Sequence, residues 1–185
     1  RGGSGDVIPH PRAELSEYLP CYDRFVLQRV PHDPSVERFV HEARAAGKRV
    51  TVDVDDLVIH ERYGPELPIL AGYTPLAREL YVQQLRRIGL VIALADDCTV
   101  STEELATELR ACFPELPVAV RRNLASRAMV AAAERARAVE TPRDRVVFGY
   151  FAGTRTHAGD LATIEGALAG LLATEPRARL LLAGE

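Results

Sequence analysis

Apolar positions recur along the chain with two periods, one typical of strands and one typical of helices. Short apolar runs at 25–27 and 49–54 predict strands, the second rich in β-branched residues. Asp33-Pro34 predicts a helix start between them and Gly47 its end. The apolar residues of that helix are spaced three or four apart: Val36, Phe39, Val40 and Ala43. A β-α-β unit of this kind implies parallel strands joined by a right-handed crossover.

The alternation of strand and helix continues to the end of the chain. It predicts an α/β fold with parallel sheets. Residues 60–74 contain two prolines and two glycines and are expected to form a long loop. The further predicted helices are 76–95 (with Gly89 as a weak point), one opened by Ser101-Thr102-Glu103-Glu104 as a capping box, 126–140 and 161–173. The further predicted strands are 98–100, 117–120, one starting at Val146, and 179–183.

These elements divide the chain into two expected domains. Residues 1–124 form a Rossmann-like domain, 125–144 a helical connector, and 145–185 the beginning of a second Rossmann-like domain. The last segment contains only strand, helix and strand, which cannot bury both faces of a sheet. We therefore expect the chain to be a piece of a larger protein.

Composition narrows the class of protein. A net charge of −3 gives no global positive field, so nucleic acid is not an expected partner. The cysteines Cys21, Cys98 and Cys112 are odd in number and widely spaced, which favours neither a disulfide framework nor a zinc site. We infer a reducing compartment and expect a cytoplasmic protein. The apolar-rich stretch 88–95 is too short to span a bilayer.

The stretch 146–160 is the first candidate site. A strand start, a loop with Gly149, Gly153 and Gly159, and a helix start follow one another, an arrangement that favours an anion. The side chains of the loop that could bind phosphate are Thr154, Arg155, Thr156 and His157. The spacing matches neither the dinucleotide fingerprint nor a P-loop. The alternative is a tight strand-to-helix turn with Asp160 as the helix cap.

Asp53, Asp55 and Asp56 form the second candidate site, at the carboxyl end of a predicted strand. Ligands of open α/β sheets bind at that edge. Alternation places Asp53 and Asp55 on one side of the strand, where the carboxylates would repel unless a cation or hydrogen-bond donors compensate. They are candidates for a Mg²⁺ site, for a base or nucleophile, or simply for capping the loop.

Arg29 is the third candidate, at the end of the first predicted strand. It is suited to a phosphate or carboxylate of a ligand, and equally to pairing with Asp53–Asp56. Ser101 follows another strand, but its predicted role is to cap the next helix.

Several stretches, taken in order, resemble a subgroup of bacterial glycosyltransferases, the family 4-like (group 1) enzymes of the GT-B fold. The resemblance covers about residues 20–185. The stretches are Tyr22–Pro31, Gly47–Leu57, Thr99–Glu103, Arg122-Asn123, Gly149–His157 and Leu180–Gly184.

That resemblance implies two Rossmann-like domains facing a cleft, with the acceptor on the first and a nucleotide-diphosphate sugar on the second. Arg29 and Asn123 would lie on the acceptor side, with Asp53, Asp55 and Asp56 as the catalytic candidates. The loop 149–157 would face the diphosphate. The implied reaction is glycosyl transfer with retention, without a cofactor and without a metal. The implied acceptor is a glycan, a lipid or a small molecule, so contact with a membrane surface stays open.

The family's donor domain carries two glutamates separated by seven residues, and this sequence contains no such pair. The pair would be expected beyond Glu185, and the family's first strand before Arg1. Two alternatives stay open. One is a haloacid dehalogenase-like phosphatase that uses Asp53 and Asp55. The other is a non-catalytic module that binds sugars or nucleotides.

Overall fold

The predicted α/β class is confirmed by a computed structural model, which describes residues 5–9, 14–137, 144–151 and 158–184. The chain separates into two compact units, Arg1–Leu124 and Ala125–Glu185. Each is described by itself.

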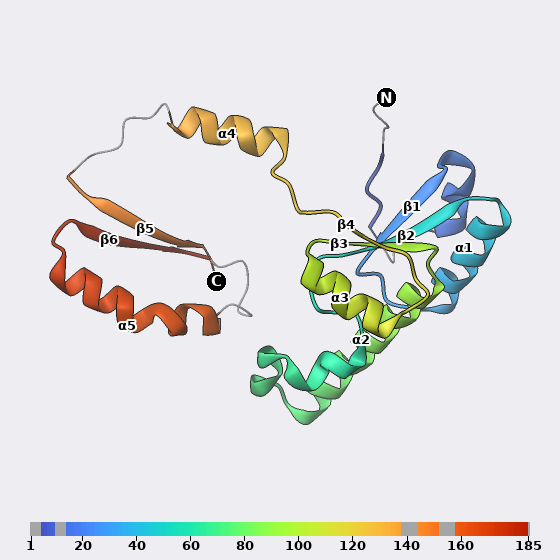
Figure 1. Cartoon of the computed structure of the whole chain (residues 1–185), viewed down its shortest axis with the longest axis horizontal. Helices are drawn as coiled ribbons and strands as arrows, with labels where there is room; N and C mark the ends of the chain where they lie inside the picture. The colour runs from blue at the N-terminus through green and yellow to red at the C-terminus, as the bar shows by residue number, and fades with distance from the viewer. Residues whose placement is uncertain (1–4, 10–13, 138–143, 152–157, 185) are drawn as a thin grey trace. The chain divides into compact units, whose positions relative to one another are not determined.

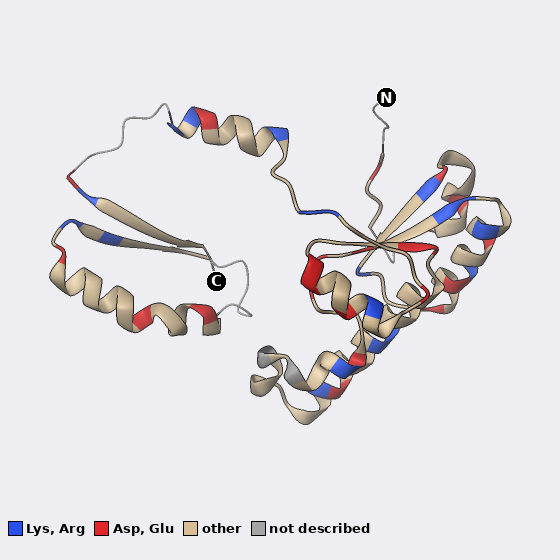
Figure 2. Cartoon of the chain, in the orientation of Figure 1, with Lys and Arg blue, Asp and Glu red and all other residues tan. Residues whose placement is uncertain are grey.

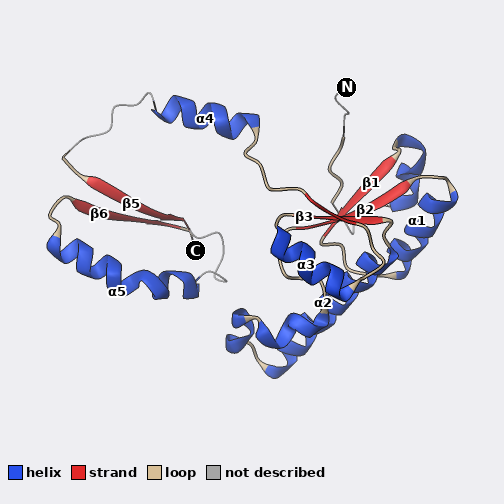
Figure 3. Cartoon of the chain, viewed as in Figure 1, coloured by secondary structure: helices blue, strands red, loops and turns tan. Residues whose placement is uncertain are grey.

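The first unit contains a parallel sheet in which strands follow one another in chain order (Figures 1 and 3). Its strands are β1 (Arg24–Gln28), β2 (Arg49–Val54), β3 (Asp97–Val100) and β4 (Val118–Val120). Each crossover therefore moves in the same direction across the sheet. With right-handed crossovers, this order places all the connecting helices on one face.

Three helices cover that face: α1 (Pro34–Ala45), α2 (Pro75–Leu94) and α3 (Glu103–Cys112). Alternate strand residues face them, so Val50, Val52 and Val54 of β2 are all buried. The helices contribute the matching half of one hydrophobic core. Its helical members are Val36, Phe39, Val40, Ala43, Ile88, Val91, Ile92, Leu105, Ala106 and Leu109.

The predicted loop at 60–74 is more regular than expected. It forms two short 3₁₀ helices, η2 (Glu61–Glu66) and η3 (Pro68–Gly72). A third, η1 (Leu15–Cys21), precedes β1 and was not predicted. Prolines and glycines argued for loop, but a 3₁₀ turn needs few hydrogen bonds and tolerates both residues.

The signals for the start and the end of α1 agree with the structure, whereas the cap signal of α3 is displaced by one residue. The carboxylate of Asp33 accepts from the backbone N–H groups of Ser35 and Val36, as a cap should. The predicted cap Ser101 is wrong, because Thr102 accepts from the N–H of Leu105 at the start of α3. The helix predicted to run through Gly89 is confirmed, because α2 continues unbroken across it.

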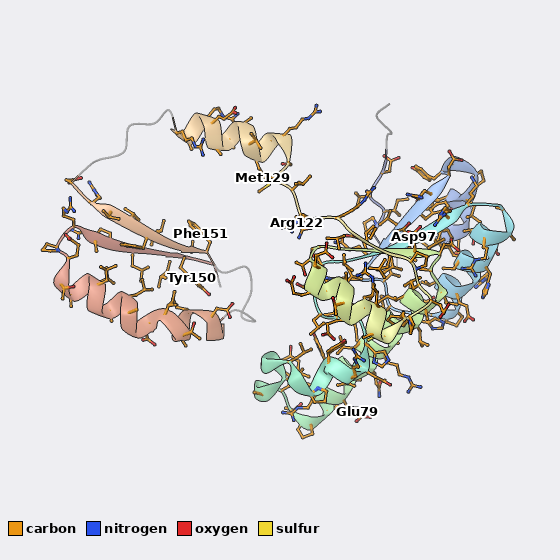
Figure 4. All side chains as sticks on the ribbon, viewed as in Figure 1. Glu79, Asp97, Arg122, Met129, Tyr150 and Phe151 are labelled. Carbon is orange, nitrogen blue, oxygen red and sulfur yellow. The ribbon has the colours of Figure 1, made fainter. Side chains whose placement is uncertain are left out.

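The second unit contains α4 (Arg127–Arg137), β5 (Val146–Phe151), α5 (Ala158–Thr174) and β6 (Ala178–Ala183). The strands β5 and β6 pair in parallel. Only Asp160 and Glu165 are charged in α5, and the rest of this helix is tan in Figure 2, the colour of residues that are not charged. Tyr150 lies on the same sheet face as its register partner Leu182, which packs with α5 (Figure 4). Its neighbour Phe151 lies on the opposite face and is 73% exposed.

Candidate functional site

Three charged residues meet at the carboxyl edge of the first sheet. Nη2 of Arg29 lies 3.1 Å from Oδ1 of Asp55 and also contacts Oδ2 of Asp56. Arg29 follows β1, while both aspartates follow β2, and the two strands are neighbours. Of the two roles that the sequence left open for Arg29, the structure shows one: Arg29 pairs with two members of the aspartate cluster. It is also the cation that compensates their mutual repulsion.

The backbone of Arg29 is unusual. Its φ is 51°, in the left-handed region, and it is the one non-glycine with positive φ among the described residues. That conformation costs a residue with a Cβ roughly 1 kcal/mol. Here it turns the chain sharply at the end of β1, and the side chain reaches the loop after β2 from this turn.

Ser101 connects the third strand to the same edge. Its hydroxyl donates to the backbone oxygen of Asp55 over 3.2 Å. Sequence reasoning gave Ser101 a capping role, but Thr102 takes that role and leaves Ser101 for the loop. The segments after β1, β2 and β3 are thus linked through one aspartate.

Asp53 has different surroundings from Asp55 and Asp56. It lies in β2 on the sheet face opposite the helices, and its Oδ1 accepts a hydrogen bond from the hydroxyl of Thr99. Thr99 is its register partner on β3, so the two side chains stand side by side. Because β2 ends at Val54, strand alternation no longer governs Asp55.

Thr99 was not predicted as a site residue. The signal that would have found it is a hydroxyl near the end of one strand, beside an aspartate on the neighbouring strand. Reading that signal requires the register between β2 and β3, which the sequence of either strand does not give.

The same open face carries a second acidic group, Asp97 of β3 (Figure 4), which pairs with Arg49. Burial by itself raises the pKa of Asp97, but the nearby hydroxyl of Thr51 and the hydrogen bond and charge of Arg49 outweigh it. The pKa lies below its ordinary value of 3.8 as a result.

Cys98 lies between these residues on the helix side of β3 and is fully buried. Burial, helped by the negative charges of Asp53 and Asp97, raises the pKa of its thiol to about 12. A thiol held protonated in this way is a small core residue and not a nucleophile.

The other predicted residues lie elsewhere or outside the described residues. Asn123 is exposed and follows β4, beyond the same carboxyl edge. Gly149 belongs to β5 and pairs with Leu181, so the predicted loop start at Gly149 is wrong. Strand pairing continues through Gly149 to Phe151. The loop residues Gly153, Thr154, Arg155, Thr156 and His157 lie outside the described residues.

The predicted alternative role of Asp160 as a helix cap is wrong. The helix α5 begins at Ala158, so Asp160 lies in its first turn. A carboxylate in that position is still favoured by the helix dipole. The hydroxyl of Thr163 donates to the backbone oxygen of Asp160 over 2.6 Å.

Two further properties of the described residues concern metal binding and membrane crossing. No group of three or more histidine, cysteine, aspartate or glutamate side chains in the described part of the chain is arranged to hold a metal ion. None of the described helices combines the length and the apolar character that crossing a bilayer requires. Comparison with known proteins found no matching family model and no matching curated protein.

Proposed function

We propose that this chain is part of a GT-B glycosyltransferase that transfers a sugar from a nucleotide-diphosphate donor to an acceptor. The observation that carries the proposal is the linked cluster of Arg29, Asp55 and Asp56 at the carboxyl edge of a parallel sheet. That edge is where open α/β sheets bind ligands. The second α/β unit, with its own parallel strands, supports a two-domain arrangement.

The acceptor belongs to the first unit in this proposal. Asp53, Asp55 and Asp56 supply carboxylates that accept a hydrogen bond from an acceptor hydroxyl and take its proton. Arg29 positions two of them, and Asn123 stands beyond the same edge. The acceptor is a glycan, a lipid or a small molecule, and a lipid acceptor would bring the protein to a membrane surface.

The donor belongs to the second unit. The stretch after β5 carries Gly153, two threonines, Arg155 and His157, and it precedes the amino end of α5. Backbone N–H groups and these basic side chains would stabilise the departing diphosphate. The transfer would be retaining and would need neither metal nor cofactor. Free thiols at Cys21, Cys98 and Cys112 favour the cytoplasm.

The phosphatase alternative receives less support from the position of the lysine. Such an enzyme needs a lysine beside the nucleophilic aspartate, and Lys48 is the only lysine of the chain. Lys48 precedes β2, at the opposite end of the strand from Asp55. Its Nζ donates to the backbone oxygen of Tyr22 over 2.6 Å.

Calorimetric titration of the whole enzyme of which this chain is proposed to be a part, with UDP-glucose, GDP-mannose, ADP-glucose and dTDP-glucose, tests the proposal. One donor should bind, and Arg155→Gln or His157→Gln should weaken it about tenfold through loss of a charged hydrogen bond. Arg145→Gln is the matched control, because Arg145 precedes β5 at its other end. Absence of binding to all four donors would overturn the proposal, and so would an equal effect of all three variants.

A further inference from the structure

A hollow of about 460 Å³ lies beside the carboxyl half of β1. The segment 6–9 forms its far wall, and the polar residues that line it are Asp6, Gln28, Arg29 and Asp53. Its size is that of a small-molecule site. Asp53 and Arg29 both line this hollow, although their side chains have different hydrogen-bond partners.

The wall of this hollow is held in place. The hydroxyl of Tyr22 donates to the carboxylate of Asp6, which ties the segment 6–9 to the start of β1. Apolar side chains complete the surface, among them Ile8, Leu15 and Val26. An apolar wall opposite a few polar groups is the usual form of a site for a ring-shaped polar molecule.

The guanidinium of Arg29 is already engaged. Its Nη2 contacts both Asp55 and Asp56, so its charge is balanced by two carboxylates. Asp6 and Asp53 line the hollow in addition. Two carboxylates pair with the guanidinium and two more line the same hollow, so the local potential opposes a phosphate or carboxylate of a ligand.

Asp53 is the group best placed to contact a ligand. Its Oδ1 accepts from Thr99, and within the described residues Oδ2 has no hydrogen-bond partner. An ionised carboxylate only accepts hydrogen bonds. The complementary group on a ligand is therefore a hydroxyl or an ammonium.

We propose that this hollow binds the acceptor, and that the acceptor is a polyol that is neutral or carries an amine, not an anionic one. The inference rests on the proposed function, since it names the acceptor class of the same site. Asp53 accepts from a hydroxyl or ammonium of the acceptor. Arg29 keeps Asp55 and Asp56 in place and does not contact an anion.

Glucosamine, glucose and glucuronate test the proposal, because they share one ring and differ in charge. Their affinities for the full chain are measured by NMR titration with ¹⁵N-labelled protein. The expected order is glucosamine, then glucose, then glucuronate, with about tenfold between the first and the last at low salt. The shifted resonances should include those of Gln28 and Asp53. Tighter binding of glucuronate, equal affinities or no binding of any of the three would overturn the proposal.

Three variants test which side chains cause the expected charge preference. Asp53→Asn should reduce the preference for glucosamine over glucuronate at least about threefold, whereas Asp97→Asn, on the same sheet face but outside this hollow, should leave it unchanged. Arg29→Gln should increase the preference, because it removes the balancing charge. A loss of glucuronate affinity of about tenfold or more in Arg29→Gln, beyond the roughly threefold loss that the charge change alone produces, would show that Arg29 contacts the anion directly, and the proposal would then be wrong. Far-UV circular dichroism checks the fold of each variant.

The monosaccharide titration and the nucleotide-sugar titration can fail independently of each other. Nucleotide-sugar binding without a charge preference at the hollow overturns only the acceptor class. A glucosamine preference without binding of any nucleotide sugar overturns the glycosyltransferase proposal and leaves a carbohydrate-binding site beside β1.

Discussion

The guanidinium of Arg29 and the carboxylate of Asp55 lie 3.1 Å apart, although 26 positions separate them in the sequence. Neighbouring parallel strands bring their carboxyl ends to one edge, and a left-handed residue after β1 turns the arginine toward the second strand. The pair is half exposed, so its ionic contribution to stability is small. Its importance lies in fixing the position of a carboxylate at the edge where a ligand would bind.

Because the backbone of Arg29 is left-handed, glycine should be more stable than alanine at this position, the reverse of their order in a helix. Arg29→Gly should be more stable than Arg29→Ala by about 1 kcal/mol, because both variants lose the ion pairs and only glycine adopts φ 51° freely. Urea unfolding followed by circular dichroism measures the difference. The control is Arg38, exposed within α1, where the glycine variant should be the less stable by about 1 kcal/mol. The same sign at both positions would contradict the backbone conformation.

The bond between Thr99 and Asp53 predicts a split between two conservative variants. Thr99→Val removes the hydroxyl and should cost about 1–3 kcal/mol, because a half-buried carboxylate loses its donor. Thr99→Ser keeps the hydroxyl and should cost less than half of that. The free energy of unfolding in urea is the measurement. Equal losses would mean that the threonine methyl, and not the hydrogen bond, carries the effect.

The lowered pKa of Asp97 predicts an acid-dependent contribution to stability. A carboxyl group with a depressed pKa in the folded state stabilises it above about pH 4, and that contribution disappears as the pH falls through the folded pKa. Asp97→Asn should therefore cost about 1 kcal/mol near neutral pH and less at about pH 3. Unfolding curves of both proteins at the two pH values give the comparison. A cost of Asp97→Asn that is the same at both pH values would refute the assigned cause.

The raised pKa of Cys98 predicts the opposite dependence at alkaline pH. The folded state retains the thiol proton up to about pH 12, whereas an unfolded cysteine loses it near its ordinary value of 9.0. This part of the stability is complete below about pH 9 and is lost as the pH rises toward 12. Cys98→Ala should flatten that decline.

Alkylation provides a second measurement on the same thiol. Iodoacetamide at mildly alkaline pH should modify the exposed Cys21 of the native chain and leave Cys98 unmodified until urea is added. Peptide mass mapping distinguishes the two sites. Modification of Cys98 at the rate of Cys21 in the native protein would contradict its burial.

Periodicity predicted the elements of this chain well because their packing uses the ordinary periods. Asp33-Pro34 and the valines of β2 illustrate this, since cap, proline and alternating burial all depend on residues a few positions apart. The edge cluster depends instead on which strands are neighbours. Two interpretations of Arg29 stayed open until β1 and β2 were seen side by side.

The errors also have local physical causes. Ser101 and Thr102 are both good helix caps, and a one-residue difference decides which hydroxyl is left for the Asp55 loop. Gly149 was assigned to a loop because glycine is rare in strands, but β5 accepts it with the ring of Phe151 lying against it. Neither distinction is encoded in the composition of the segment.

Gly89 gives the last prediction, since its role follows from packing and not from helix propensity. A Cβ at this position would lie 3.0 Å from the backbone oxygen of Ile59, which passes close to α2. Gly89→Ala should therefore destabilise the protein by about 1–3 kcal/mol, although alanine is the better helix former. Gln84→Ala, at an exposed position of the same helix, should change stability by less than about 0.5 kcal/mol. Thermal and urea unfolding of the two variants measure the contrast, and a stabilised Gly89→Ala would mean that α2 and residue 59 are not in close contact.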